Sequence, residues 1–188
     1  MNGWIFTGVL LAIALYAIVV FNRLIRLRNL AREGWSGIDV QLKRRTDLVP
    51  NLVATVKAYA AHERSVLEEV TASRQSSIAA DDVSRRASAE NALQGSLGRL
   101  FAVAEAYPEL KADKNFLELQ QQLAEIEDQL QMARRYYNGT VRNLNISIQS
   151  FPNNLVAGML GFRELPFFEL EDRSQAATPS VAFQAATS

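Results

Sequence analysis

The chain of 188 residues contains no cysteine and a single histidine, His62. Without cysteine there can be no disulfide framework, no thiolate metal site and no lipid-acylated cysteine. One histidine is too few for a structural zinc site of the usual ligands, or for a di-iron bundle, which uses two Glu-x-x-His motifs. The sequence therefore predicts no metal and no cofactor.

The chain also lacks net charge, because 20 basic side chains balance 20 acidic ones. A nucleic-acid-binding protein needs a basic surface to displace counterions from phosphates, so we expect no nucleic-acid partner. The charges are nevertheless unevenly placed along the chain. Residues 23–45 carry seven basic and two acidic side chains, so the remainder carries 13 basic and 18 acidic ones. A segment of net charge +5 thus precedes a body of net charge −5.

Charged side chains are absent from residues 1–22, and the run from Gly3 to Phe21 is apolar apart from Thr7. As a helix this run would be roughly 28 Å long, close to the thickness of the hydrocarbon core of a bilayer. Trp4 and Phe21, near its two ends, are aromatic residues of the kind enriched at membrane interfaces. We predict that residues 1–22 form a transmembrane anchor.

A cleaved signal peptide is the alternative for this segment. Signal peptides begin with basic residues and end in a small-x-small cleavage site, and the first 22 residues offer no basic side chain and only a poor cleavage site. A basic collar follows instead, made of Arg23, Arg26, Arg28 and Arg32. Positive charge favours the cytoplasmic side, so we expect the N-terminus outside and the rest of the chain in the cytoplasm. The arginines either fix this topology only or also bind anionic lipid headgroups.

Beyond residue 22, apolar residues recur mostly at spacings of three and four, which is typical of packed amphipathic helices. Period-two alternation is not sustained, so we expect an all-α fold. Breakers and caps divide the pattern into four helices at about residues 22–46, 48–74, 82–106 and 114–150. Short links between helices favour antiparallel neighbours. The sequence therefore predicts an up-and-down four-helix bundle within residues 23–170.

Several helix starts allow more than one interpretation. Asp47 would cap the second helix with Pro50 in its first turn, whereas a single kinked helix through Pro50 is the alternative. Asp81 or Asp82 would cap the third helix. The fourth would begin either with a capping box, Asn115 and Glu118, or with Asp113 as its cap. These alternatives stay open at the level of the sequence.

The C-terminal part of the chain departs from the helical pattern. Residues 153–169 are apolar and interrupted by glycine, which predicts a short helix and a strap that packs back on the bundle. The alternative is a partner-docking patch that includes Phe162, Phe167 and Phe168. Residues 171–188 end in a stretch of small and polar residues with too little bulk to bury, so we predict a disordered tail.

Candidate catalytic chemistry would have to use His62, which we expect midway along the second helix. The residues three and four positions away are Ala58, Tyr59, Ser65 and Val66, so no carboxylate shares its helical face. No glycine-rich phosphate loop follows a strand, since no strand is predicted. We expect a solvated histidine, no small-molecule substrate and no enzyme.

Six sequence segments stand out along the chain: WSGIDVQLKRRTDLVPNLV at 35–53, VKAYAAHE at 56–63, AVAEAYPELK at 102–111, NFLELQ at 115–120, ARRYYN at 133–138 and FPNN at 151–154, followed by Gly161-Phe162 and Phe168-Glu169. In this order, over about residues 20–170, they resemble the signature of the LemA family. One departure is Thr46, where an aromatic residue is common. The resemblance implies a bacterial protein with one N-terminal transmembrane helix and a cytoplasmic helical bundle, with relatives in magnetosome membranes. The family has no defined catalytic residues, so none is carried over.

The charged motif at residues 42–51 has two interpretations. It is either a cap, a turn and a helix restart, or a partner-docking corner made of Lys43, Arg44, Arg45, Asp47, Pro50 and Asn51. We expect a non-enzymatic scaffold or adaptor in the bacterial cytoplasmic membrane, acting through a protein partner or through homo-oligomers. The alternative is a membrane-surface module that binds or shapes anionic bilayers through the basic collar.

Overall fold

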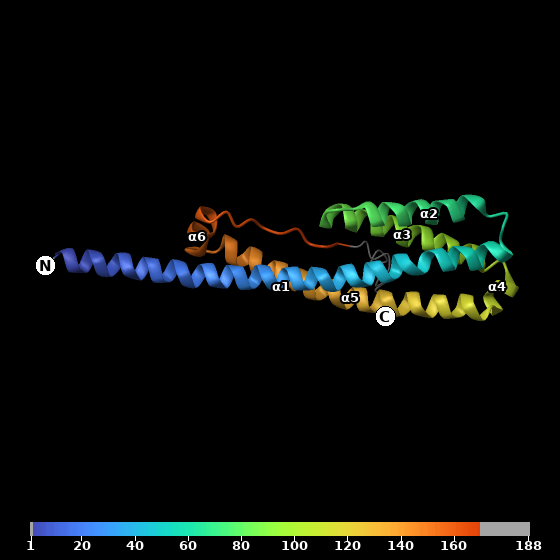
Figure 1. Cartoon of the computed structure of the whole chain (residues 1–188), viewed down its shortest axis with the longest axis horizontal. Helices are drawn as coiled ribbons and strands as arrows, with labels where there is room; N and C mark the ends of the chain where they lie inside the picture. Colours follow the sequence, from blue (N-terminus) through green and yellow to red (C-terminus); the bar gives the residue numbers. More distant parts are fainter. Residues whose placement is uncertain (1, 170–188) are drawn as a thin grey trace, which may run out of the picture.

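The structure is a computed structural model that describes residues 2–169 (Figure 1). It contains, in order, α1 (Asn2–Tyr59), α2 (Arg64–Ala79), α3 (Val83–Ala104), α4 (Pro108–Ala112), α5 (Lys114–Gln149) and α6 (Asn153–Met159). No strand occurs within this described range, so the prediction of an all-α protein is confirmed. The predicted tail, residues 171–188, lies outside the described residues.

Helix α1 runs the length of the molecule, and the other helices pack along it (Figure 1). Helix α5 lies antiparallel beside it. The Tyr59 hydroxyl donates to Asp113 Oδ2 at 3.1 Å at one end of the pair, and Leu24 packs with Leu144 near the other. Helices α2 and α3 pack on each other beside the C-terminal half of α1, while the first turns of α1 protrude beyond every other helix (Figure 1).

Buried apolar side chains form three clusters along the long axis. The first includes Leu52 and Leu100 and lies among α1 to α5. The second contains Ile38 and lies between α1, α5 and the start of α3, under the chain that follows α6. The third joins Leu24 to Ala157 of α6. These buried side chains are mostly the apolar residues that recur at spacings of three and four in the sequence. The apolar face predicted for each long helix is therefore the face that packs.

The predicted helix boundary at residues 46–48 is wrong. Helix α1 continues through Pro50 to Tyr59, so the alternative of one continuous helix is confirmed. Asp47 does not cap a helix, because its carboxylate pairs with Lys43 Nζ at 3.1 Å within α1. The chain turns at residues 60–63 instead, where neither glycine nor proline occurs, so no strong local breaker marks the turn.

Pro50 is accommodated inside α1 by a donor from another helix. Proline has no N–H, so the carbonyl of Thr46, four residues earlier, has no helical donor. Arg74 of α2 supplies one, because its Nε donates to the Thr46 carbonyl at 2.7 Å. A carbonyl left unpaired in such a place costs roughly 1–3 kcal/mol, so this bond offsets part of the penalty of the proline.

The starts of α3 and α5 agree more closely with the sequence predictions. The carboxylate of Asp82 accepts the Arg85 N–H at 2.8 Å and caps α3, which is one of the two predicted caps. Asp113 accepts the Phe116 N–H at 2.9 Å and caps α5. The capping box of Asn115 and Glu118 is therefore wrong, and the alternative cap at Asp113 is confirmed.

Helix α2 is displaced relative to the predicted second helix. It begins at Arg64 and continues to Ala79, five residues beyond the predicted end at about residue 74 and into a stretch of small and polar residues. The helix persists there because Ser77 is fully buried and donates its hydroxyl hydrogen to Glu90 of α3. A tertiary contact thus overrides the weak local preference of serine for non-helical backbone.

After α6 the chain runs back along α1 and α5 as an extended strap, residues 160–169 (Figure 1). Asn145 exchanges two hydrogen bonds with the backbone of Leu165, at 2.9 and 3.0 Å. Asn138 does the same with Phe168, at 3.0 and 2.9 Å. The two asparagines are seven residues apart and share a face of α5, so they hold the strap along the helix.

Candidate functional site

The protruding part of α1 is apolar and exposed. Residues 3–16 are all exposed, and Trp4 reaches 90 % exposure. Only 6 % of the most apolar 18-residue window of α1 is buried within the chain. Exposed apolar surface costs roughly 25 cal/mol per Å² in water, so such a segment needs an apolar surrounding. Within the described range, α1 is the one helix long and apolar enough to cross a membrane.

The basic collar lies where this segment joins the packed helices. The side chains of Arg23, Arg26, Arg28 and Arg32 are all exposed. Nearby, Val20 and Leu24 are the first fully packed apolar residues of α1. The Arg28 guanidinium lies over the ring of Phe162, 5.2 Å from its centre, and that ring meets Phe21 edge-on at 6.1 Å. The collar therefore marks the border between the protruding segment and the body.

The predicted docking residues do not form one surface. Five of the six from the charged motif are exposed: Lys43, Arg44, Asp47, Pro50 and Asn51. Arg45 is only 4 % exposed and faces inward. Among the phenylalanines, Phe167 is 40 % exposed and Phe162 is half-buried. Phe168 is fully buried and meets the Trp35 ring at 5.5 Å, so it is a packing residue of the strap.

Arg45 belongs to a polar cluster that we call the Arg45 cluster, made of the buried residues Arg45, Ser77 and Glu90 and the half-buried Glu127. Arg45 Nη1 lies 3.4 Å from Glu90 Oε2, and Nη2 donates to Glu127. The Ser77 hydroxyl donates to the other oxygen of Glu90. The four residues come from α1, α2, α3 and α5, so the cluster joins four helices.

Burial is the largest influence on the pKa of Glu90 in this cluster. Burial raises the pKa of Glu90 above its ordinary value, and the Ser77 hydroxyl and the Arg45 guanidinium act in the opposite direction. Perturbed carboxyls often mark active sites. Glu90 is fully buried, however, and no substrate reaches its carboxylate in this conformation. The arrangement is suited to fixing the register of the helices, a role that buried ion pairs have in some proteins.

Glu90 and its partners were not singled out from the sequence. One signal was present, because Glu90 lies three residues from Ala87 and three from Leu93 and so falls on the apolar face of its helix. No such signal identified Arg74, whose partner lies 28 residues away, or Asn138 and Asn145, whose partners lie 30 and 20 residues away.

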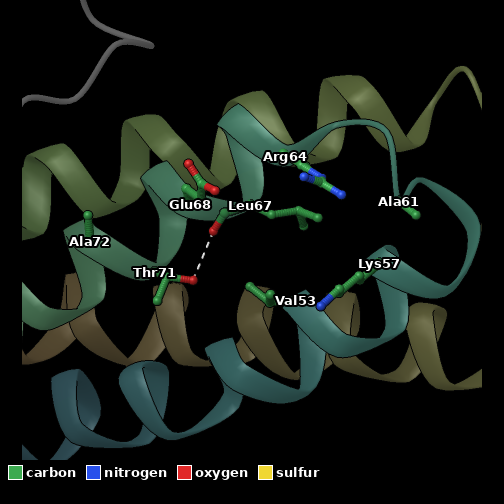
Figure 2. A pocket seen from close by; sticks show the side chains of 8 residues that line it. All are labelled: Val53, Lys57, Ala61, Arg64, Leu67, Glu68, Thr71 and Ala72. Carbon is green, nitrogen blue, oxygen red and sulfur yellow. Dashed lines mark hydrogen bonds between the residues drawn. The ribbon is translucent and has the colours of Figure 1, made fainter.

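A groove of about 610 Å³ lies between the end of α1 and α2 (Figure 2). It is lined by Val53, Lys57, Ala61, Arg64, Leu67, Glu68, Thr71 and Ala72. Figure 2 shows the side chains of Lys57 and Arg64 near the Ala61 end of the groove. The Thr71 hydroxyl donates to the Leu67 carbonyl at 2.8 Å, as an ordinary helical serine or threonine does. The Thr71 hydroxyl, which is the one hydroxyl among these lining residues, is therefore engaged within its own helix.

His62 lies in the turn between α1 and α2, so its predicted place midway along a helix is wrong. The helix that would have carried it ends at Tyr59 instead. Its side chain is exposed. Within residues 2–169, no group of three or more histidine, aspartate or glutamate side chains is placed to hold a metal ion.

Comparison with known proteins gives consistent matches. Magnetosome protein MamQ of Magnetospirillum gryphiswaldense is 23 % identical over 193 residues, which cover 85 % of this chain and 71 % of MamQ. Magnetosome proteins MamQ 1 and MamQ 2 of Paramagnetospirillum magneticum are each 26 % identical over 175 residues, covering 79 % of this chain and 64 % of theirs. Protein LemA of Metamycoplasma hominis is 27 % identical over 156 residues, covering 80 % of this chain and 69 % of its own length.

The sequence model that describes the LemA family matches residues 34–183, which is most of the chain. The match begins within the packed part of α1 and includes α2 to α6. It covers the motifs that carry the sequence resemblance, from the charged motif of α1 to the strap. The chain belongs to the LemA family.

Proposed function

We propose that this protein is a membrane-anchored, non-enzymatic helical scaffold or adaptor at the cytoplasmic face of a bacterial membrane. The observation that carries the proposal is the protruding apolar segment of α1, which is exposed on every side while the rest of α1 is packed. The exposed basic collar beside it supports an orientation with the N-terminus outside. The relatives named as magnetosome proteins fit a role at a membrane.

The body of the protein would act through protein partners or through copies of itself. In our proposal α1, α2, α3 and α5 serve as an up-and-down four-helix bundle that presents a surface to other proteins. Lys43, Arg44, Asp47 and Asn51 are exposed charged or polar side chains on the outside of α1 and are the residues proposed for docking.

The test uses the full chain in its native membrane. A photo-reactive amino acid at Asn51 should yield a crosslinked product with a partner protein or with a second copy, and the same amino acid at His62 serves as the matched control. A reporter that is active only in the cytoplasm should be active when it is fused after Ser188. A chain that stays monomeric in mild detergent, and that yields no crosslinked product from any exposed position, would contradict the scaffold.

A second function is supported by the basic collar itself. Four exposed arginines on less than three turns of helix would bind anionic headgroups, each contributing roughly 1 kcal/mol. In this alternative the protein binds or reshapes anionic bilayers. Replacing Arg23, Arg26, Arg28 and Arg32 with glutamine in the full chain should then abolish remodelling of anionic liposomes. Unchanged remodelling by that variant would exclude this function.

A further inference from the structure

Helix α6 lies against α1 at the point where the protruding segment leaves the packed helices (Figure 1). The Tyr16 hydroxyl donates to Asn153 Oδ1 at 2.8 Å. Ala157 is fully buried in one cluster with Val20 and Leu24. These contacts place α6 beside the last turns of the apolar run of α1. Residues more than 130 positions later in the sequence therefore lie at the level of the anchor.

We call residues 151–161, which comprise α6 and its two flanks, the α6 corner. Four of its large apolar side chains are exposed: Phe151 at 79 %, Leu155 at 58 %, Met159 at 88 % and Leu160 at 51 %. Scattered exposed apolar residues are normal, but four within ten positions form a patch of the kind that marks a protein or membrane contact. The corner thus extends the exposed apolar surface of α1 onto a second element.

The charge pattern of the corner repeats that of the anchor. No Asp, Glu, Lys, Arg or His occurs in residues 143–162, as none occurs in residues 1–22. Arg142 and Arg163 flank this uncharged stretch and are exposed. Arg163 directly follows Phe162, the ring under the Arg28 guanidinium. An uncharged end bordered by arginines on both segments is the pattern expected where a protein enters a bilayer.

A groove with a mixed apolar and polar lining, which includes Leu27 and Ile146, lies between the corner and the basic collar. Its volume is about 390 Å³. Arg23, Asn143, Ser147, Ser150 and Asn153 supply its polar lining. Ser147 is only 4 % exposed, and within the described residues its Oγ has no hydrogen-bond partner. Hydroxyl and amide groups beside a guanidinium suit the phosphate layer of a membrane, where charge-assisted hydrogen bonds form.

We propose that the α6 corner is a second membrane contact, which enters the cytoplasmic interface of the same bilayer that α1 spans. The inference rests on the proposed anchoring. A bilayer that covers α1 as far as Phe21 also covers Asn153, since Asn153 contacts Tyr16. The occupant of the patch is therefore lipid and not a protein partner. Two contacts on different elements hold the body in one orientation, whereas a lone helix would let it swing.

Because the chain has no cysteine of its own, a single introduced cysteine can be labelled without labelling any other position. Three full-length variants, Met159→Cys, Leu11→Cys and His62→Cys, would each carry an NBD fluorophore in vesicles of phosphatidylcholine and phosphatidylglycerol. Met159 and His62 are exposed, and Leu11 is 63 % exposed, so none of the substitutions removes a packed side chain. Nitroxide-labelled lipids with the spin label near the headgroup or deep in the acyl chain then report the depth of each fluorophore.

We expect blue-shifted NBD emission at position 159, quenched several-fold more by the shallow spin label than by the deep one. Position 11 should be quenched mainly by the deep label, and position 62 by neither. Quenching at position 11 without quenching at position 159 would overturn the second contact and leave the anchor intact. No quenching at position 11 would overturn the anchoring itself. A label at Leu155→Cys should repeat the result at position 159, and its failure to do so would also contradict the proposal.

Discussion

At the scale of single residues, Arg74 and Pro50 should be energetically coupled although they lie on different helices. Replacing Arg74 with leucine leaves the Thr46 carbonyl without its 2.7 Å donor, so we expect the free energy of unfolding to fall by about 1–3 kcal/mol. In a Pro50→Ala background the helix supplies its own N–H, and the same replacement should cost less. Denaturation of the four full-length proteins in detergent micelles measures this coupling. Equal costs in both backgrounds would contradict it.

Two glycines one turn apart in α1 should respond in opposite directions to alanine. A Cβ at Gly34 would lie 3.0 Å from Tyr137 Cα and 3.2 Å from Tyr136 Cδ1, whereas at Gly37 the nearest atom is Ala133 Cβ at 3.9 Å. Alanine improves helix propensity by roughly 0.5–1 kcal/mol, and overpacking costs about 1–3 kcal/mol. Thermal unfolding should show a higher Tm for Gly37→Ala and a lower one for Gly34→Ala. A rise in both would mean that α1 and α5 do not approach closely at Gly34.

The Arg45 cluster should give stability a dependence on pH. Arg45→Met leaves the buried Glu90 without its guanidinium, which should cost about 3–5 kcal/mol at neutral pH. Burial already raises the pKa of Glu90, and the loss of the cation raises it further. The folded variant therefore binds a proton more readily than the unfolded chain, and its deficit should shrink as the pH falls through that pKa. Urea denaturation at pH 7 and pH 5 measures the deficit. A deficit that grows at pH 5 would contradict this account.

At the scale of elements, the strap should open locally when its two asparagine contacts are removed. Asn138→Ala and Asn145→Ala each remove two hydrogen bonds to the strap backbone, so together they should speed hydrogen exchange at Leu165 and Phe168 roughly ten- to hundredfold. Exchange in α3 should not change. Asn143→Ala, an exposed position on the same helix, is the matched control. Unchanged exchange in the strap of the double variant would show that its apolar contacts suffice.

The elements that the sequence predicts well are those whose signals are local. The starts of α3 and α5 follow from the acidic caps Asp82 and Asp113, which act within three residues. The end of α1 could not be predicted, because Pro50 is a strong local breaker whose effect is offset by a donor from α2. The real turn, at residues 60–63, carries neither glycine nor proline.

The same distinction applies to the sites. The segment proposed as the anchor is visible in the sequence because it is one continuous apolar run. The α6 corner is not, since its significance depends on α5 folding back along α1 and bringing Asn153 beside Tyr16. The sequence predicted that the C-terminal apolar segment, residues 153–169, forms a short helix and a strap or, alternatively, a partner-docking patch. Phe168 of that segment is buried, however, whereas Met159 within it is 88 % exposed and Phe151 just before it is 79 % exposed.

At the scale of the whole molecule, the protein is a long rod with a charge-free apolar end and a helical body (Figure 1). Helix α1 is shared by both parts, since its first turns protrude and its remainder packs against α2 and α5. In the proposed account, the body is joined to the membrane through this continuous helix and, beside it, through the α6 corner. The central claim of this account is that the protruding end spans a bilayer.

Alkaline extraction of native membranes that contain the full-length chain tests that claim most directly. Sodium carbonate at high pH releases proteins that are held by charge or by peripheral contacts, whereas a span of roughly 20 apolar residues stays in the bilayer. We predict that the protein sediments with the washed membranes and enters solution only after detergent is added. Release of the protein into the carbonate wash would contradict the account.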